Sequence, residues 1–518
     1  MKQYSRTKNS ILNLTTGLFN QVVMTVLSFL SRTVFIQVLG ASYLGINGLF
    51  SDILSLLSLT QLGIGTAITY KLYKPAADHD EKRIRILMKF YKQAYIIIGT
   101  VILVLGLLLI PLLPVVIKEY DKLDSLGINA PLIFILFLLQ NVTSYLFFAY
   151  RAAIIRVEQK SYILHFVDFF TSVTTILLQI AALVITKNYI VFISVGIGMM
   201  ILQNLINSII AWKMFPYAFR REKESISKKE RNNILKDCSA LFVFRVSGVV
   251  LKATDNLVLS SILGLAFVGL YSNYLIFYTT IKMIISHFYG AIYAGMGNAF
   301  AKDTKEKTYF LFETVNFMTI LLNGTACVGL AVCSNELIHV WIGDDFVLAQ
   351  PFALLIGIEM LFSGLKINLG QVRNVSGVFR QAWQRPLIGV LINVVVSIIL
   401  CKYIGICGVI IGTITADILA NFMIDPRIIH KYSFENYKPV SHYYKKNLMF
   451  LVILAIVGLA DYHICRILAT GVELFDLLLH IAICGLSVPA VFFLIYRKSE
   501  VCQYLWGKVK EYKITKKH

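Results

Sequence analysis

Charged side chains interrupt several long apolar segments of this 518-residue sequence. An ionisable group in the hydrocarbon layer of a membrane is costly, so it usually faces a water-filled cavity or a partner of opposite charge. The cations in these segments outnumber the deepest acids, which are Asp52, Asp255 and Glu359. If they converge, they predict a net positive cavity that suits an anion, and phosphate above all, because Arg presents a planar fork of donors. The candidate substrate-binding cations are Arg32, Arg245, Lys252, Lys282 and Lys366.

Helical spacing places these residues on polar faces together with uncharged side chains. The predicted faces are Gln21–Thr25–Ser28–Arg32, Arg245–Lys252–Asp255, Tyr274–Tyr278–Lys282 and Glu359–Lys366. Two interpretations stay open for each charge: direct contact with a substrate, or pairing inside the protein, such as Arg32 with Asp52 or Lys252 with Asp255. The tyrosines suit stacking on sugar rings, but they are equally typical of ordinary packing in a membrane.

The composition requires a membrane protein. Hydrophobic residues make up 57% of the chain and charged residues 15%, whereas an average soluble domain has about 25% charged residues. The formal net charge of +20 therefore does not indicate nucleic-acid binding, because cytoplasmic loops of membrane proteins collect Lys and Arg. The eight cysteines follow no metal-ligand spacing, and neither a zinc site nor a disulfide framework is predicted.

Runs of about 20 apolar residues, enough to cross a bilayer, predict an all-α integral membrane protein with about fourteen spans. With the N-terminus inside, most Lys and Arg residues fall in cytoplasmic segments and few in external loops, so both termini are predicted to be cytoplasmic. The predicted spans are 11–38, 45–70, 90–117, 128–150, 161–186, 189–212, 237–262, 266–295, 310–333, 350–371, 386–401, 405–426, 447–465 and 474–496.

A short internal repeat indicates duplication. The stretch LGASYLGI at 39–46 matches LGLAFVGL at 263–270, and each lies between the first two spans of its half. Chance is the alternative, since Leu and Gly are common in membrane proteins. Duplication predicts two pseudo-symmetric six-helix lobes around a central cavity, a common plan of transporters. The predicted parts are an N-terminal lobe (1–214), a cytoplasmic linker (215–236), a C-terminal lobe (237–430), and two extra helices with a basic tail (431–518).

Signatures of catalysis are missing from the sequence. It contains no GxxxxGK[ST], HExxH or GxSxG motif, and no polar segment is long enough for a catalytic domain. These observations favour a transporter over an enzyme.

Several stretches resemble bacterial polysaccharide flippases of the Wzx-like family, in the multidrug/oligosaccharidyl-lipid/polysaccharide exporter superfamily. They include SRTVFIQVLGASYLGINGLFSDILSLLSLTQLGIGTAITYKLYKP at 31–75, ATDNLVLSSILGLAFVGLYSNYLIF at 253–277 and RNVSGVFRQAWQRPLIGVLINVVVSIIL at 373–400. The resemblance implies alternating-access export of an undecaprenyl diphosphate-linked oligosaccharide from the cytoplasmic to the outer leaflet of a bacterial plasma membrane. It implies a diphosphate contact most firmly for Arg32, less firmly for Arg245 and Lys252, and least for Lys282 and Lys366.

The expected partners are the lipid-linked oligosaccharide diphosphate, membrane lipids, and polymerase and chain-length or export proteins of capsule, O-antigen or exopolysaccharide synthesis. No cofactor is predicted. The membrane potential is the expected energy source, and proton or sodium coupling through Asp52, Asp255 or Glu359 is an open alternative. Two other functions stay open, a lipid II flippase and a cation-coupled multidrug antiporter.

Overall fold

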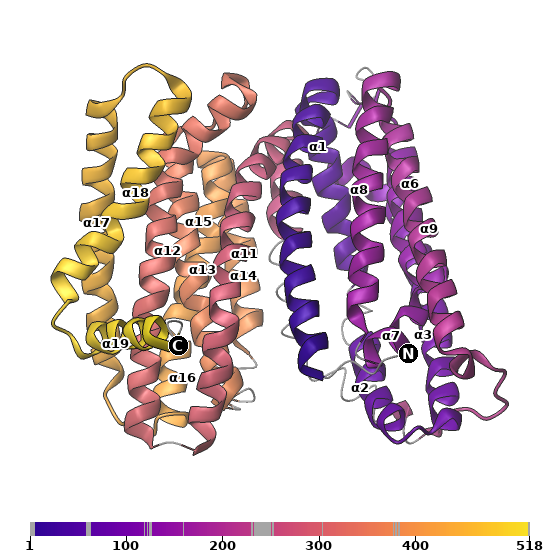
Figure 1. Ribbon diagram of the computed structural model, residues 1–518. Helices are drawn as coiled ribbons and strands as arrows, with labels where there is room; N and C mark the ends of the chain where they lie inside the picture. The colour runs from indigo at the N-terminus through magenta and orange to yellow at the C-terminus, as the bar shows by residue number, and fades with distance from the viewer. Residues whose placement is uncertain are drawn as a thin grey trace. The chain divides into compact units, whose positions relative to one another are not determined.

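The computed structural model describes residues 6–58, 64–118, 120–121, 123, 127–158, 160–228, 231–232, 250, 253–302, 304–376, 378, 381 and 384–515 (Figure 1). Throughout these ranges the regular structure is helical, with no strand. The chain forms two compact units, Met1–Gly269 and Leu270–His518, and the long helix α11 begins shortly before the boundary. The predicted all-α membrane architecture is confirmed, while the four-part division of the sequence stays a prediction.

The first unit is a helical bundle. Helix α1 contacts α6 and α8, α8 contacts α9, and α6 contacts both α3 and α9. Its elements are α1 (Arg6–Leu57), α2 (Ile64–Ala77), α3 (Glu81–Leu109), η2 (Ile110–Leu112), α4 (Leu113–Val116), α6 (Ala130–Leu146), η3 (Ala149–Arg151), α7 (Ala152–Val157), α8 (Ser161–Thr186), α9 (Tyr189–Met214) and η4 (Pro216–Phe219).

Local capping explains where two of these helices begin. The side chain of Asp80 accepts a hydrogen bond from the Arg83 backbone nitrogen (2.9 Å) at the start of α3. Asn129 does the same for the Leu132 nitrogen (3.0 Å) at the start of α6. Each cap satisfies a backbone donor that has no partner inside its own helix.

The second unit is organised around α12 and α13, which pack on each other. Helix α18 contacts both α12 and α17. Helices α17 and α18 lie side by side at one edge of the unit, where Figure 1 shows them in yellow. The elements are α11 (Leu265–Lys302), α12 (Lys305–Ile342), η5 (Asp344–Phe346), α13 (Gln350–Ser376), α14 (Arg385–Ile404), α15 (Ile406–Ala416), the π-helical segment η7 (Asp417–Phe422), α16 (Asp425–Tyr432), α17 (Val440–Leu468), α18 (Glu473–Tyr496) and α19 (Glu500–Thr515).

The predicted number of fourteen spans is not confirmed. Within the described ranges, ten helices are long and apolar enough to cross a membrane, or eleven if the bent pair Ala130–Leu146 and Ala149–Val157 counts as one span. Two differences from the prediction have a clear origin. The first predicted span and the start of the second lie in α1, which consists of two helices that meet at a kink at Gly40, between the two predictions, so a single candidate span stands there for two predicted ones. Most of the predicted span 237–262 lies outside the described residues.

The internal repeat corresponds to a reciprocal contact within the first unit. Gly40 and Gly264 hold the same place in the two copies, and both have the positive φ that favours glycine (+82° and +106°). An ideal Cβ on Gly45 would lie 2.0 Å from the carbonyl oxygen of Leu265, and one on Gly269 would lie 2.3 Å from that of Ala41. Ala41 and Leu265 also occupy matching places, so the contact is symmetric. This symmetry agrees with duplication.

We expect Gly45→Ala to destabilise the protein by about 1–3 kcal/mol, the usual cost of forcing an extra group into a packed site. The added methyl meets backbone, which has no alternative rotamer. The measurement is the thermal unfolding midpoint of purified protein. Gly198→Ala in α9 is the control, because a Cβ at Gly198 has nothing within 4 Å. Equal midpoints for the two variants would contradict the close contact.

Candidate functional site

The predicted polar faces of two helices meet in the second unit. The Nζ of Lys282 on α11 donates to the hydroxyl of Tyr278 (3.1 Å) and to the Oγ of Ser363 on α13 (2.5 Å). It also lies 5.1 Å from the centroid of the Tyr278 ring. The Tyr278 hydroxyl is hydrogen-bonded to Glu359 of α13. The spacing of four residues between Tyr278 and Lys282 therefore predicted a real contact, and Glu359 belongs to the same cluster.

Lys366, two turns beyond Glu359 on α13, is paired inside the protein. Its Nζ lies 2.8 Å from Oδ1 of Asp417, whose side chain is almost fully buried. Asn421 donates to the same carboxylate oxygen (2.8 Å). Asp417 and Asn421 belong to η7, a π-helical segment, and such segments occur often at functional sites. For Lys366, the pairing interpretation is the one that this geometry supports.

A second ion-pair cluster continues from Asn421 toward α16. Asp425, which is 0% exposed, accepts from Nη1 of Arg373 (2.6 Å) through one carboxylate oxygen and from Nη1 of Arg385 (2.9 Å) through the other. Arg385 also donates to Asn421. The contacts join α13, α14, η7 and α16 in one buried network. The sequence does not predict this network, because each Arg follows or precedes an apolar segment, where a cation is typical of a cytoplasmic loop.

The acids of the first unit are also buried. Asp52 on α1 accepts a hydrogen bond from Nδ2 of Asn256. Asp255, the residue before Asn256, is also buried. Arg32 and Thr25 lie on the same helix and are half-buried, whereas Ser28 is exposed. The structure thus adds Asn256, which sequence analysis did not single out, to the surroundings of Asp52.

Tyr274 has a different setting from Tyr278, although both belong to one predicted face. Its hydroxyl donates to Oδ1 of Asn335 (2.7 Å) and accepts from the Leu348 backbone nitrogen (2.8 Å). Its ring packs edge-on against Phe352, 5.0 Å between centroids. These contacts fasten the segment between α12 and α13, so Tyr274 has a structural role in this conformation.

Three predicted site residues are not placed by the structure. Arg245 and Lys252 lie outside the described residues, and so does the side chain of Gln21. Within the described ranges, no group of three or more His, Cys, Asp and Glu residues is arranged to hold a metal ion.

The charges of the two polar clusters in the second unit nearly balance. The four cations Lys282, Lys366, Arg373 and Arg385 lie among three carboxylates, those of Glu359, Asp417 and Asp425. Buried ion pairs stabilise only when both partners stay in place. These contacts can hold the helices in register, and loss of the charge of any one member would destabilise their packing.

No family model and no curated protein sequence matches the chain. Solved structures do match. The chain aligns with a lipid II flippase MurJ in an inward closed conformation at 16% identity and TM-score 0.63, over 93% of this chain and 98% of that one.

Multidrug transporters match over a smaller share of the chain. An inward-facing MATE transporter of the MOP superfamily aligns at 14% identity and TM-score 0.61, over 80% of this chain and 96% of that one. An outward-facing MATE transporter of the same superfamily aligns at 13% identity and TM-score 0.54, over 84% of this chain and 99% of that one. The chain is therefore a multi-pass helical membrane protein with the fold shared by the MurJ flippase and MATE transporters.

Proposed function

We propose that this protein is a flippase that moves an undecaprenyl diphosphate-linked oligosaccharide repeat unit from the cytoplasmic to the outer leaflet of a bacterial plasma membrane. The fold match to the lipid II flippase MurJ carries this proposal, because it extends over 93% of the chain. The two MATE structures cover less of it, 80% and 84%. The choice of an oligosaccharide repeat unit rests on the sequence stretches that resemble Wzx-like flippases.

The proposed mechanism is alternating access with the diphosphate held by cations. Arg32 is the first candidate, because it lies half-buried on a membrane-spanning helix. Arg245 and Lys252 are further candidates, and Lys282 is a fourth, since its ammonium lies in a polar cluster with the hydroxyls of Tyr278 and Ser363. Lys366 is the weakest candidate, because Asp417 neutralises it.

The membrane potential is sufficient to drive the proposed export. Each charge that crosses the field changes the free energy by ~2.3 kcal/mol per 100 mV. A diphosphate with two negative charges moving out of a negative interior would gain roughly 5 kcal/mol per 100 mV if it crossed the whole field. Proton or sodium coupling through Asp52, Asp255 or Glu359 is the alternative energy source, and it predicts a dependence on the ion gradient at fixed potential.

The test uses a strain that lacks the gene. We expect undecaprenyl diphosphate-linked oligosaccharide to accumulate on the cytoplasmic leaflet and surface polysaccharide to fall, with both restored by the wild-type gene. Leaflet position is measured by the accessibility of the sugars to an impermeant modifying reagent in oriented vesicles. Normal intermediates and normal polymer would overturn the proposal.

A lipid II flippase is the second candidate, favoured by the fold match to the lipid II flippase MurJ. It predicts that depletion of the protein is lethal and that lipid II accumulates instead of a polysaccharide intermediate. A multidrug antiporter, the third candidate, predicts that the deletion strain loses drug resistance while all lipid-linked intermediates stay normal.

A further inference from the structure

A basic pocket of about 540 Å³ lies in the first unit, where the N-terminal turns of α3 face η3, η4 and the segment that follows η4. That segment, residues 220–228, is called the linker segment below. The pocket is lined by Arg85, Lys89 and Lys92 of α3, by Arg151 of η3, and by Arg220, Arg221, Glu222 and Lys223 of the linker segment. Seven of these side chains are cationic and one is anionic. None of them belongs to the predicted transport site.

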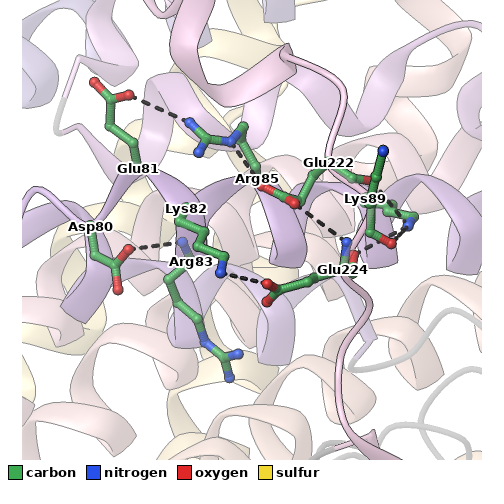
Figure 2. Close-up of polar contacts among 9 residues, drawn as sticks. Asp80, Glu81, Lys82, Arg83, Arg85, Lys89, Glu222 and Glu224 are labelled. Carbon is green, nitrogen blue, oxygen red and sulfur yellow. Dashed lines mark hydrogen bonds and ion pairs between the residues drawn. The ribbon is translucent and has the colours of Figure 1, made fainter.

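Residues of α3 hold the linker segment, which forms one wall of the pocket, through hydrogen bonds and ion pairs (Figure 2). The Nζ of Lys89 donates to three successive carbonyl oxygens, those of Glu222, Lys223 and Glu224 (3.1, 3.1 and 3.2 Å). The Nε of Arg85 lies 3.2 Å from Oε2 of Glu222, and Nζ of Lys82 lies 2.5 Å from Oε1 of Glu224. The backbone from Glu222 to Glu224 is therefore held against α3, and the basic side chains of Arg220, Arg221 and Lys223, in and next to it, line the pocket.

The positive charge of the pocket is not cancelled by protein acids. Glu222 is the one acid in the lining, and the hydrogen bond from Arg85 lowers the pKa of its carboxyl below the ordinary value. Within the described residues, Lys92, Arg220, Arg221 and Lys223 make no ion pair and no side-chain hydrogen bond. Four cations therefore face the pocket with their charge available to a ligand.

Arg151 supplies an oriented guanidinium to the same pocket. Its Nη1 donates to Oγ of Ser208 (2.9 Å), and its guanidinium carbon lies 4.7 Å from the ring centroid of Phe148 and 5.0 Å from that of Phe219. Contacts with aromatic rings keep an Arg side chain in place without using up its donors. A pre-oriented guanidinium is the side chain best matched to phosphate oxygens.

The position of the pocket along α3 is the one expected for the headgroup layer of a membrane. Lys92 lies one helical turn, about 6 Å, before Ile96, where exposed apolar side chains begin on α3. Trp212 is 55% exposed at the end of α9, a position typical of the aromatic residues at membrane interfaces. Basic pockets at this depth bind phosphate-bearing headgroups.

We propose that this pocket binds a phosphate group, carried either by the headgroup of an anionic membrane lipid or by a water-soluble phosphate. The proposal does not rest on the flippase function, because the pocket and its cations belong to the first unit alone. Ligand binding would add a negative charge beside the linker segment and strengthen its hold on α3.

The test compares two double variants of the full-length protein that remove the same charge from the same part of the chain. Arg220→Gln/Arg221→Gln changes two exposed residues that line the pocket, and Lys228→Gln/Arg231→Gln changes two exposed residues outside the lining. Each protein is placed in phosphatidylcholine nanodiscs with or without phosphatidylglycerol, and retained lipid is counted by native mass spectrometry. In a second arm, pyrophosphate is titrated into phosphatidylcholine nanodiscs, and the thermal midpoint is recorded.

The two arms identify the source of the phosphate. A several-fold loss of retained phosphatidylglycerol in the pocket variant, with normal retention in the control, supports a lipid headgroup. A pyrophosphate-dependent rise of the midpoint that only the pocket variant loses supports a water-soluble phosphate. Equal loss in both variants would mean that binding depends on the overall surface charge and not on the pocket, which would overturn the proposal. Absence of binding in both arms would overturn it as well.

Discussion

Asp425→Asn is expected to destabilise the second unit severely. The carboxylate of Asp425 is fully buried and bonds both Arg373 and Arg385, whose side chains are 6% and 10% exposed. The substitution keeps the shape of the side chain but leaves two buried cations without their acid. Breaking a buried ion pair by removing one partner costs about 3–5 kcal/mol, which is a large part of the roughly 5–15 kcal/mol that stabilises a typical protein.

The measurement for Asp425→Asn is the yield of folded protein together with its thermal unfolding midpoint. Glu435→Gln serves as the matched control, because Glu435 also pairs with a cation, Lys305 (3.1 Å), but both side chains are well exposed. Exposed pairs contribute about 0–1 kcal/mol, so the control should behave nearly as the wild type. Similar losses in the two variants would contradict the buried network as a source of stability.

The class of fold could be predicted from the sequence because its cause is local. Long apolar runs must become helices in a bilayer, since each backbone donor and acceptor needs a partner within the segment. The repeat at 39–46 and 263–270 was visible for the same reason, because its glycines meet a local backbone requirement at Gly40 and Gly264. The number of spans is not confirmed, but the non-helical backbone of Gly40 separates two helices within α1, between the first two predicted spans.

The site could be predicted only where its contacts lie along one helix. The spacing of Tyr278 and Lys282 was enough to place them together. The pairing of Lys366 with Asp417, and of two arginines with Asp425, depends on how α13, α14 and α16 pack, and no pattern within one segment contains that information. The basic pocket was missed similarly, because its walls come from segments more than a hundred residues apart.

Arg32→Ala is expected to reduce export at least tenfold while the protein stays folded and abundant. A charge-assisted hydrogen bond is worth about 1.5–3 kcal/mol, and loss of about 1.4 kcal/mol already corresponds to a factor of ten. Arg32→Lys should give an intermediate result, because it keeps the charge but loses the planar fork of donors. Lys213→Gln is the control, since it removes an exposed cation at the end of α9 in the same unit.

The dependence of the Arg32→Ala flipping rate on substrate density distinguishes a role of Arg32 in substrate binding from a role in the conformational cycle. The measurement is the rate of flipping in proteoliposomes at several densities of the lipid-linked substrate, under an imposed potential. If Arg32 holds the diphosphate, the variant should approach the wild-type rate as substrate density rises, because only the affinity has fallen. A lower rate that persists at saturating substrate would instead place Arg32 in the conformational cycle, and normal export at every density would remove it from the mechanism. The Arg32→Ala result therefore tests the anion site independently of which sugars the lipid carries.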